Sequence, residues 1–178
     1  MVSSRPGRAV QNLRMTPRIR EATERDWPAI WSIVRDVVVA ADTFAYDPET
    51  TEDQGRALWM VGSPGRTTVA VDGTEVSGTA NMYANRAGPG AHVASASFMV
   101  ASAAGGRGMG RALVADALSW ARSAGFRAMQ FNAVAETNVE AIALYRSLGF
   151  SIVGTVPEAF DHPEHGLVGL HVMHLKLR

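Results

Sequence analysis

Apolar residues follow two different periods along this chain, and each period predicts a type of element. Between residues 26 and 41 the apolar positions fall three or four residues apart, which predicts an amphipathic helix. These positions are Trp27, Ile30, Val34, Val37, Val38 and Ala41. Short β-rich stretches over 18–22, 67–71, 76–82 and 92–100 predict four strands. The pair Asp72-Gly73 predicts the tight turn of a hairpin between the second and third of these strands.

The remaining stretches continue the alternation of helices and strands. We expect helices over 51–61, 108–123 and 138–148, and strands over 128–134, 150–156 and 168–177. The resulting order, β-α-α-β-β-β-α-β-α-β-β, is typical of an α/β domain in which helices cover both faces of one mixed sheet. A length of 178 residues suits a single domain with a sizeable core.

Composition narrows the class of protein but does not identify it. The 17 basic and 17 acidic residues balance, so nothing in the net charge points to nucleic acid or a membrane as partner. The chain has no cysteine, which excludes thiolate metal sites and cysteine nucleophiles and is compatible with a cytoplasmic protein. Residues 1–17 carry three arginines among polar residues and predict a disordered basic tail, which leaves 18–178 as the domain.

A glycine-rich turn follows the strand that ends at Val100. Gly106, Gly108 and Gly110 alternate with long side chains, and a helix pattern begins at once. Alternating glycines direct successive N–H groups to one point, and a helix start adds unpaired N–H donors, which together favour a phosphate or pyrophosphate site. The spacing differs from the dinucleotide-binding G-x-G-x-x-G, and the Gly-Lys-Ser/Thr of a P-loop is absent. A tight turn that binds no ligand is the alternative that this motif leaves open.

A second segment, 138–150, predicts a helix that begins at the capping residue Asn138 and stops at Gly149. Together the two segments resemble the GNAT superfamily of N-acetyltransferases. That family pairs an Arg/Gln-x-x-Gly-x-Gly/Ala turn with a downstream Asn-x-x-Ala-x-x-Leu-Tyr-x-x-x-Gly-Phe helix. The second motif is matched in full, at Asn138, Ala141, Leu144, Tyr145, Gly149 and Phe150. The first motif departs at one position, because Gly105 stands where the family usually has Arg or Gln.

The resemblance implies both a fold feature and a co-substrate. In the family, two central parallel strands splay apart and acetyl-CoA enters the gap with its pantetheine arm, while the turn binds the pyrophosphate; no metal is expected. The implied cofactor-binding residues are Met99, Val100, Gly106, Arg107, Gly108, Met109, Gly110, Arg111, Asn138, Ala141 and Tyr145.

The resemblance also implies catalytic roles. A strand N–H near Phe98 would stabilise the developing oxyanion, and Tyr145 matches the general acid that protonates the leaving thiolate. A packed ring is the alternative interpretation of Tyr145. The general base is open between Glu136, His92, and backbone carbonyls with water.

The acceptor side is predicted from scattered residues. Asn132 is unusual within a strand and is expected to contact substrate or to bridge the splayed strands. Three short pieces, over 85–92, 131–134 and 157–160, also resemble the fungal acetyltransferases of proline analogues such as azetidine-2-carboxylate. This second resemblance implies a small amino-acid-like amine as substrate and a contact at Ser95. The connection over 43–47, which includes Thr43 and Phe44, is expected to line the same site, as the corresponding connection does in the GNAT family.

Three functions follow from these motifs. The leading hypothesis is an acetyl-CoA-dependent N-acetyltransferase that acts on a small amine. The alternatives are acetylation of a protein N-terminus or lysine, and a non-catalytic module that binds CoA. The exposed edges expected for the last strands would also allow a homodimer.

Overall fold

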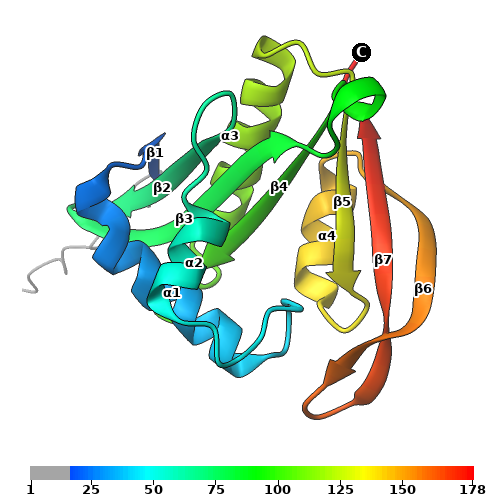
Figure 1. Cartoon of the computed structure of the whole chain (residues 1–178), viewed down its shortest axis with the longest axis horizontal. Helices are drawn as coiled ribbons and strands as arrows, with labels where there is room; N and C mark the ends of the chain where they lie inside the picture. Colours follow the sequence, from blue (N-terminus) through cyan, green and yellow to red (C-terminus); the bar gives the residue numbers. More distant parts are fainter. Residues whose placement is uncertain (1–16) are drawn as a thin grey trace, which may run out of the picture.

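The structure is a computed structural model, and it describes residues 17–178. The predicted tail, 1–17, therefore lies outside the described residues except for Pro17. Within 17–178 the chain forms four α-helices and one mixed sheet of seven strands (Figure 1). In chain order these are β1 (Arg18–Glu21), α1 (Trp27–Ala40), α2 (Glu52–Trp59), β2 (Arg66–Asp72), β3 (Glu75–Ala84), β4 (Val93–Val100), α3 (Met109–Ser123), β5 (Ala128–Ala135), α4 (Val139–Ser147), β6 (Ser151–His162) and β7 (Gly166–Lys176).

The predicted fold class and the order of elements are confirmed. The strands lie in the order β1-β2-β3-β4-β5-β7-β6, and the helices cover both faces of the sheet. On one face α3 and α4 pack on a core that includes Leu113 and Met129, while on the other face α1 packs Ile30 and Val34 against Val69. Each fully buried side chain of this size contributes about 1.5–3 kcal/mol, so both layers hold the sheet firmly. Within 17–178 none of the helices has the length and apolar character needed to cross a membrane.

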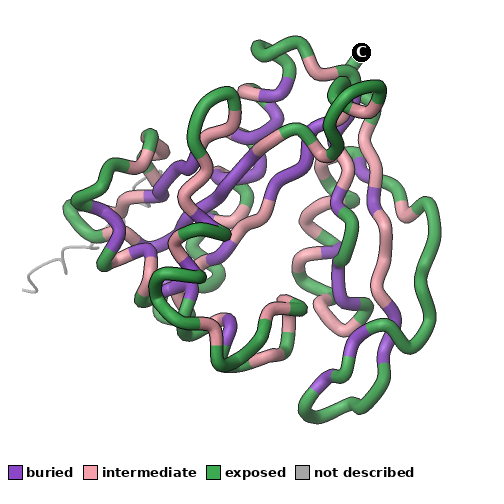
Figure 2. Tube along the Cα trace, in the orientation of Figure 1, coloured by how far each residue is buried: buried purple, intermediate pink, exposed green. Residues whose placement is uncertain are grey.

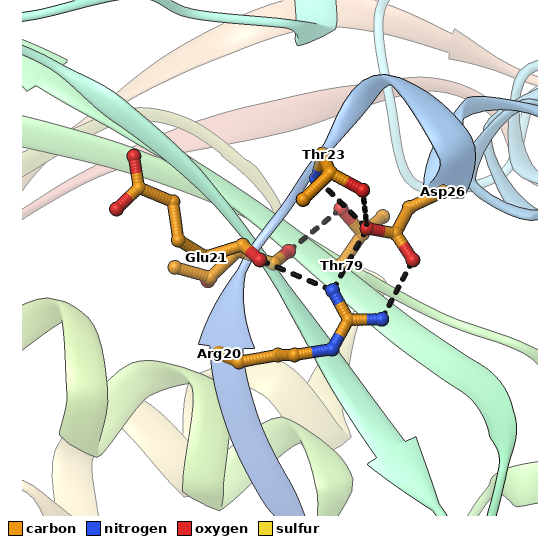
Figure 3. Close-up of polar contacts among 6 residues, drawn as sticks. Arg20, Glu21, Thr23, Asp26 and Thr79 are labelled. Atoms are coloured by element: carbon orange, nitrogen blue, oxygen red, sulfur yellow. Dashed lines mark hydrogen bonds and ion pairs between the residues drawn. The ribbon is translucent and has the colours of Figure 1, made fainter.

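An ion pair fixes the chain where β1 turns into α1. The guanidinium of Arg20 donates to both carboxylate oxygens of Asp26, with N–O distances of 2.8 and 2.7 Å (Figure 3). The same carboxylate accepts hydrogen bonds from the backbone N–H and the hydroxyl of Thr23, both at 2.8 Å. The Arg20 guanidinium and these hydrogen bonds lower the pKa of Asp26 well below its usual range. The contact ties the end of β1 to the residue that precedes α1.

Strands β4 and β5 are the parallel pair at the centre of the sheet, and they separate soon after they begin. Only Val93↔Ala128 and Ala94↔Met129 are paired, and beyond these the two strands diverge (Figure 1). This divergence is the splay that the resemblance implies. On its other side β4 stays paired with β3 along its whole length.

The last hairpin is longer than the sequence predicts. The strand expected over 150–156 continues to His162, and the strand expected from 168 already begins at Gly166. Pro157 directly follows the predicted strand, and a proline is typical of a strand end. β6 is an edge strand with a register shift between Val156 and Phe160, so a proline here disrupts no regular ladder. Most of β6 is exposed (Figure 2).

Candidate active site

The glycine turn before α3 has an open backbone. Gly106 and Gly108 have positive φ angles of +69° and +84°, and a Cβ built on either would meet no atom within 4 Å. Gly108 is the N-cap of α3, and the helix's first internal hydrogen bond runs from the N–H of Ala112 to the carbonyl of Gly108, at 3.0 Å. The N–H groups of 109–111 therefore have no partner within the helix, as at any helix start. This backbone is suited to bind a phosphate group.

A cavity of about 470 Å³ extends from this turn between β4, α3 and α4, and it is called the cofactor cavity below. Every predicted cofactor-binding residue lines it except Arg107. Arg107 instead forms an ion pair with Asp72 at the end of β2. Arg111 does line the cavity, and its Nη2 donates to the hydroxyl of Ser147 at 2.8 Å, which links α3 to α4. Of the two predicted arginines, only Arg111 therefore lines the cavity, and the Arg107 side chain is held by Asp72.

The gap edge of β4 offers free backbone groups. Hydrogen bonds run from the N–H of Ala101 to Ser77 and from the N–H of Asn85 to the carbonyl of Val93, which fixes the odd-numbered residues of β4 as the ones bonded to β3. Because hydrogen-bonded pairs alternate along an antiparallel ladder, the N–H and C=O groups of Phe98 and Val100 point away from β3 and toward the gap. The backbone of Met99 belongs to the ladder with β3, so Met99 contributes only its side chain to the cavity wall.

Tyr145 on α4 stands where two cavities meet. Its ring packs against Phe131, with centroids 4.6 Å apart, and against Phe98 and Phe150 at 6.3 and 6.0 Å. Burial raises the pKa of the Tyr145 phenol above its ordinary value. The hydroxyl therefore keeps its proton at neutral pH, which is the state that a general acid needs.

A second cavity of about 280 Å³ lies on the other side of Tyr145 and is called the acceptor cavity. Three of the residues predicted to contact substrate, Asn132, Ser95 and Phe44, line it, whereas Thr43 lines the cofactor cavity. The remaining lining residues are Ala45, Tyr46, Tyr83, Ala96, Ser97, Phe98, Phe131, Ala133, Val134 and Tyr145.

Two polar residues of this cavity, Tyr83 and Ser97, were not predicted from the sequence, whereas Tyr46 lies in the connection over 43–47 that was expected to line the acceptor site. Ser97 follows Ser95 by two positions, and the period of a strand places both on one face, so that signal was present. Tyr83 is paired with Ser95 across β3 and β4, a contact that only the register reveals. Tyr46 comes from the irregular connection between α1 and α2, which carries no periodic pattern.

Asn132 lies in a bulge of β5. Phe131 pairs with Met173 and Val134 with His171, so Asn132 and Ala133 together oppose a single residue of β7. The Asn132 amide donates to the side-chain oxygen of Asn85 at 2.6 Å and accepts from Gln130 at 2.8 Å. The side chain thus lines the acceptor cavity and also bridges β5 to the connection between β3 and β4.

The two candidate bases make local contacts elsewhere. The Glu136 carboxylate accepts the backbone N–H of Gly169 at 2.6 Å, and the ring nitrogen Nδ1 of His92 donates to the carbonyl of Pro89 at 3.0 Å. Neither residue lines the acceptor cavity. Among residues 17–178, the side chains that line this cavity include no carboxylate and no imidazole.

Comparisons with known proteins agree with this architecture. Residues 17–150 match the model of the acetyltransferase (GNAT) family. A GCN5-related N-acetyltransferase from Kribbella flavida is 61% identical, with a TM-score of 0.88 over 90% of this chain and 97% of that one. A phosphinothricin acetyltransferase from Sinorhizobium meliloti, in complex with acetyl-CoA, is 25% identical, with a TM-score of 0.80 over 91% and 89%.

A third solved structure is that of a ribosomal-protein-alanine N-acetyltransferase from Brucella melitensis. It is 29% identical, with a TM-score of 0.71 over 89% of this chain and 98% of that one. No curated protein matches the sequence. The family match spans most of the chain and includes the glycine turn and the motif of α4, so this protein belongs to the GNAT family of acetyltransferases.

Proposed function

We propose that the protein transfers the acetyl group of acetyl-CoA to the amine of a small molecule by direct attack. The observation that carries this proposal is the junction of the two cavities. The cofactor cavity and the acceptor cavity share the lining residues Phe44, Phe98 and Tyr145. An amine on one side and a thioester on the other would therefore meet beside a protonated phenol and a free strand N–H.

The residues of the cofactor cavity fit acetyl-CoA. The open backbone at Gly106 and Gly108 suits the pyrophosphate, and the gap edge at Phe98 and Val100 suits the amides of the pantetheine arm. Acetyl-CoA supplies an activated acyl group and a thiolate leaving group. Gly105 takes the place of the Arg or Gln that is usual in the family, and the backbone donors of the turn do not depend on that side chain.

Two groups of the chain assist the transfer. The N–H of Phe98 points into the gap, where it can donate to the carbonyl oxygen as negative charge develops. The Tyr145 hydroxyl holds the proton that the leaving sulfur needs when the new C–N bond forms and the C–S bond breaks. The acceptor nitrogen gives up its own proton to solvent, while a backbone carbonyl can accept its hydrogen bond, because the side chains that line the acceptor cavity among residues 17–178 include no carboxylate or imidazole.

The size of the acceptor cavity favours a small molecule over a folded protein. Its volume of about 280 Å³ is slightly below the usual range of ligand pockets, about 300–1,000 Å³, and suits a compact amine. Solved relatives carry names of both classes, phosphinothricin acetyltransferase and ribosomal-protein-alanine N-acetyltransferase.

The exposed strand β6 is the proposed contact of a homodimer, and the cytoplasm is the proposed location.

The test is release of free CoA from acetyl-CoA in the presence of a panel of small amines and short peptides. We expect turnover with at least one small amine, and mass spectrometry of the product should show a gain of one acetyl group. Turnover with peptides alone would favour a protein acetyltransferase. Binding of acetyl-CoA without turnover of any acceptor would favour a CoA-binding module and contradict the proposal.

A further inference from the structure

The wall of the acceptor cavity is built from neutral side chains. Its polar groups are hydroxyls and one amide, from Tyr46, Tyr83, Tyr145, Ser95, Ser97 and Asn132. Its apolar groups are mainly aromatic, from Phe44, Phe98, Phe131 and Val134. Among residues 17–178, no arginine, lysine or histidine lines it, so the described wall has no cation to pair with a carboxylate. Hydroxyls and an amide are suited to neutral polar groups, and the phenyl rings are suited to an apolar body.

The pKa values of two phenols in this wall indicate that the surroundings disfavour negative charge. Burial and the neighbouring Tyr83 raise the pKa of Tyr46, with Ser97 opposing this in part, and burial raises the pKa of Tyr145. In both cases the anion is disfavoured because the surroundings solvate it poorly. A carboxylate bound beside these rings would be disfavoured for the same reason.

The connection that contributes Phe44 and Tyr46 to the cavity wall carries negative charge. Phe44 and Tyr46 come from the connection between α1 and α2, and exposed carboxylates flank them at Asp42, Asp47 and Glu49. The sequence has no basic residue between 42 and 55. Exposed carboxylates on this connection attract an ammonium group and repel a carboxylate. The desolvated cavity then lowers the pKa of the bound amine, which favours the neutral nucleophile.

We infer that the acceptor is a small amine with an apolar or aromatic body and no carboxylate, such as an arylalkylamine or an amino-acid amide. The inference rests on the proposed function, because it concerns the acceptor of that same reaction. It narrows the amino-acid-like substrate expected from the sequence to amines without the acid group. In the reaction the amine nitrogen forms a bond to the acetyl carbon, the C–S bond breaks, and CoA leaves as the thiol with one proton.

The experiment compares matched acceptors that differ in one charge. CoA release is measured with L-phenylalaninamide, L-phenylalanine and phenylethylamine, and thermal stabilisation by acetyl-CoA shows that the enzyme is folded and binds its co-substrate. We expect kcat/KM for the amide and for phenylethylamine to exceed that for the free amino acid by about 10- to 100-fold, the cost of leaving a charged group unpaired. Equal or reversed values would overturn the inference and leave the proposed function intact. Absence of turnover with every amine of the larger panel would overturn both.

A charge variant tests the cause of the discrimination. Tyr83 is half-buried in the cavity wall, so a longer side chain can keep its charged end near water. We expect Tyr83→Arg to raise the ratio of kcat/KM for phenylalanine over phenylalaninamide by about tenfold, the effect of one charge-assisted contact. The matched neutral variant Tyr83→Gln should leave that ratio within about twofold of wild type, because it adds no charge. An unchanged ratio in a folded Tyr83→Arg enzyme would contradict the inference.

Discussion

The cofactor cavity and the acceptor cavity lie on either side of Tyr145, yet they are built from different parts of the chain. The cofactor cavity is formed largely by backbone, from the open turn at Gly106 and Gly108, the start of α3 and the gap edge of β4. The acceptor cavity is formed by side chains from β3, β4, β5 and the connection between α1 and α2. A backbone site tolerates many side chains as long as its glycines remain. In a site whose wall is formed by side chains, a single substitution in the wall alters which ligand the site binds best.

Strand β4 serves both cavities through its two faces and its free edge. Ser95 and Ser97 point their side chains to one face, where the acceptor cavity lies, while the edge groups of Phe98 and Val100 lie in the gap. Substitutions on this strand can therefore alter the acceptor without removing the backbone donors. The following predictions test this separation, beginning with the residue that the two cavities share.

Tyr145→Phe should reduce kcat by about 10² to 10⁴-fold, the usual contribution of a general acid. The phenyl ring keeps its packing on Phe98, Phe131 and Phe150, so the affinity for acetyl-CoA should change little. Steady-state kinetics and a direct binding measurement check the two halves of this prediction. Tyr46→Phe is the matched control, since it removes a phenol from the acceptor cavity only and should affect KM for the acceptor more than kcat. Turnover of Tyr145→Phe within about twofold of wild type would show that the ring serves packing alone.

Gly108→Asp should weaken acetyl-CoA binding by about 100-fold, because like charges brought together cost several kcal/mol. The substitution also strains the backbone at φ +84°, so a strain control is required. Gly125 has a φ of +87° and open space around it, and it lies outside both cavities. Gly125→Asp should lower the melting temperature and keep the stabilisation by acetyl-CoA, whereas Gly108→Asp should lose that stabilisation. Equal thermal shifts in the two variants would contradict a phosphate site at the turn.

Asn132→Ala should raise KM for the acceptor by about 2- to 10-fold, the loss of one neutral hydrogen bond, and leave acetyl-CoA binding unchanged. Asn85→Ala removes the other end of the bridge, and Asn85 does not itself line the cavity. If Asn132 contacts the acceptor, its variant should have the higher KM of the two. If both variants lose stability equally and neither changes KM, Asn132 serves only as a bridge between strands.

Asp26→Asn should leave kcat and the KM values for acetyl-CoA and the acceptor unchanged. It should lower only the free energy of unfolding, by about 1–3 kcal/mol at pH 7. The bidentate contact with Arg20 lowers the pKa of Asp26 in the folded state. The stabilisation is therefore complete above the unfolded-state pKa of about 3.9 and is lost as the pH falls toward the folded-state value. Denaturant unfolding from pH 7 to pH 2.5 should show the variant approaching wild type at the acid end. A constant difference over that range would contradict an ionic contribution.

The residues that line the cofactor cavity could be predicted from the sequence more completely than those that line the acceptor cavity, for a physical reason. Backbone sites need glycine at fixed positions and a helix that follows, and both leave a local pattern around Gly106–Gly110 and Asn138. Arg107 shows the limit of such patterns, because its pairing with Asp72 depends on a strand far away in the chain. Tyr83 meets Ser95 only through strand register, so no local pattern marks it, whereas Ser95 and the connection over 43–47 were expected from the resemblance. The extension of β6 past Pro157 could not be predicted locally, because a strand tolerates proline where its ladder is interrupted, and the register shift between Val156 and Phe160 is visible only in the structure.

The early separation of β4 and β5 gives the sheet an internal edge, with consequences for hydrogen exchange. Amides in the hydrogen-bonded pairs of β3 and β4 should exchange with deuterium slowly, whereas the gap-facing amides of Phe98 and Val100 have no strand partner and should exchange quickly. Bound acetyl-CoA would occupy that edge as a further strand does in a complete sheet. Its protective effect should then appear in the middle of the sheet, while the outer strand β6 keeps the same exchange rate with and without ligand.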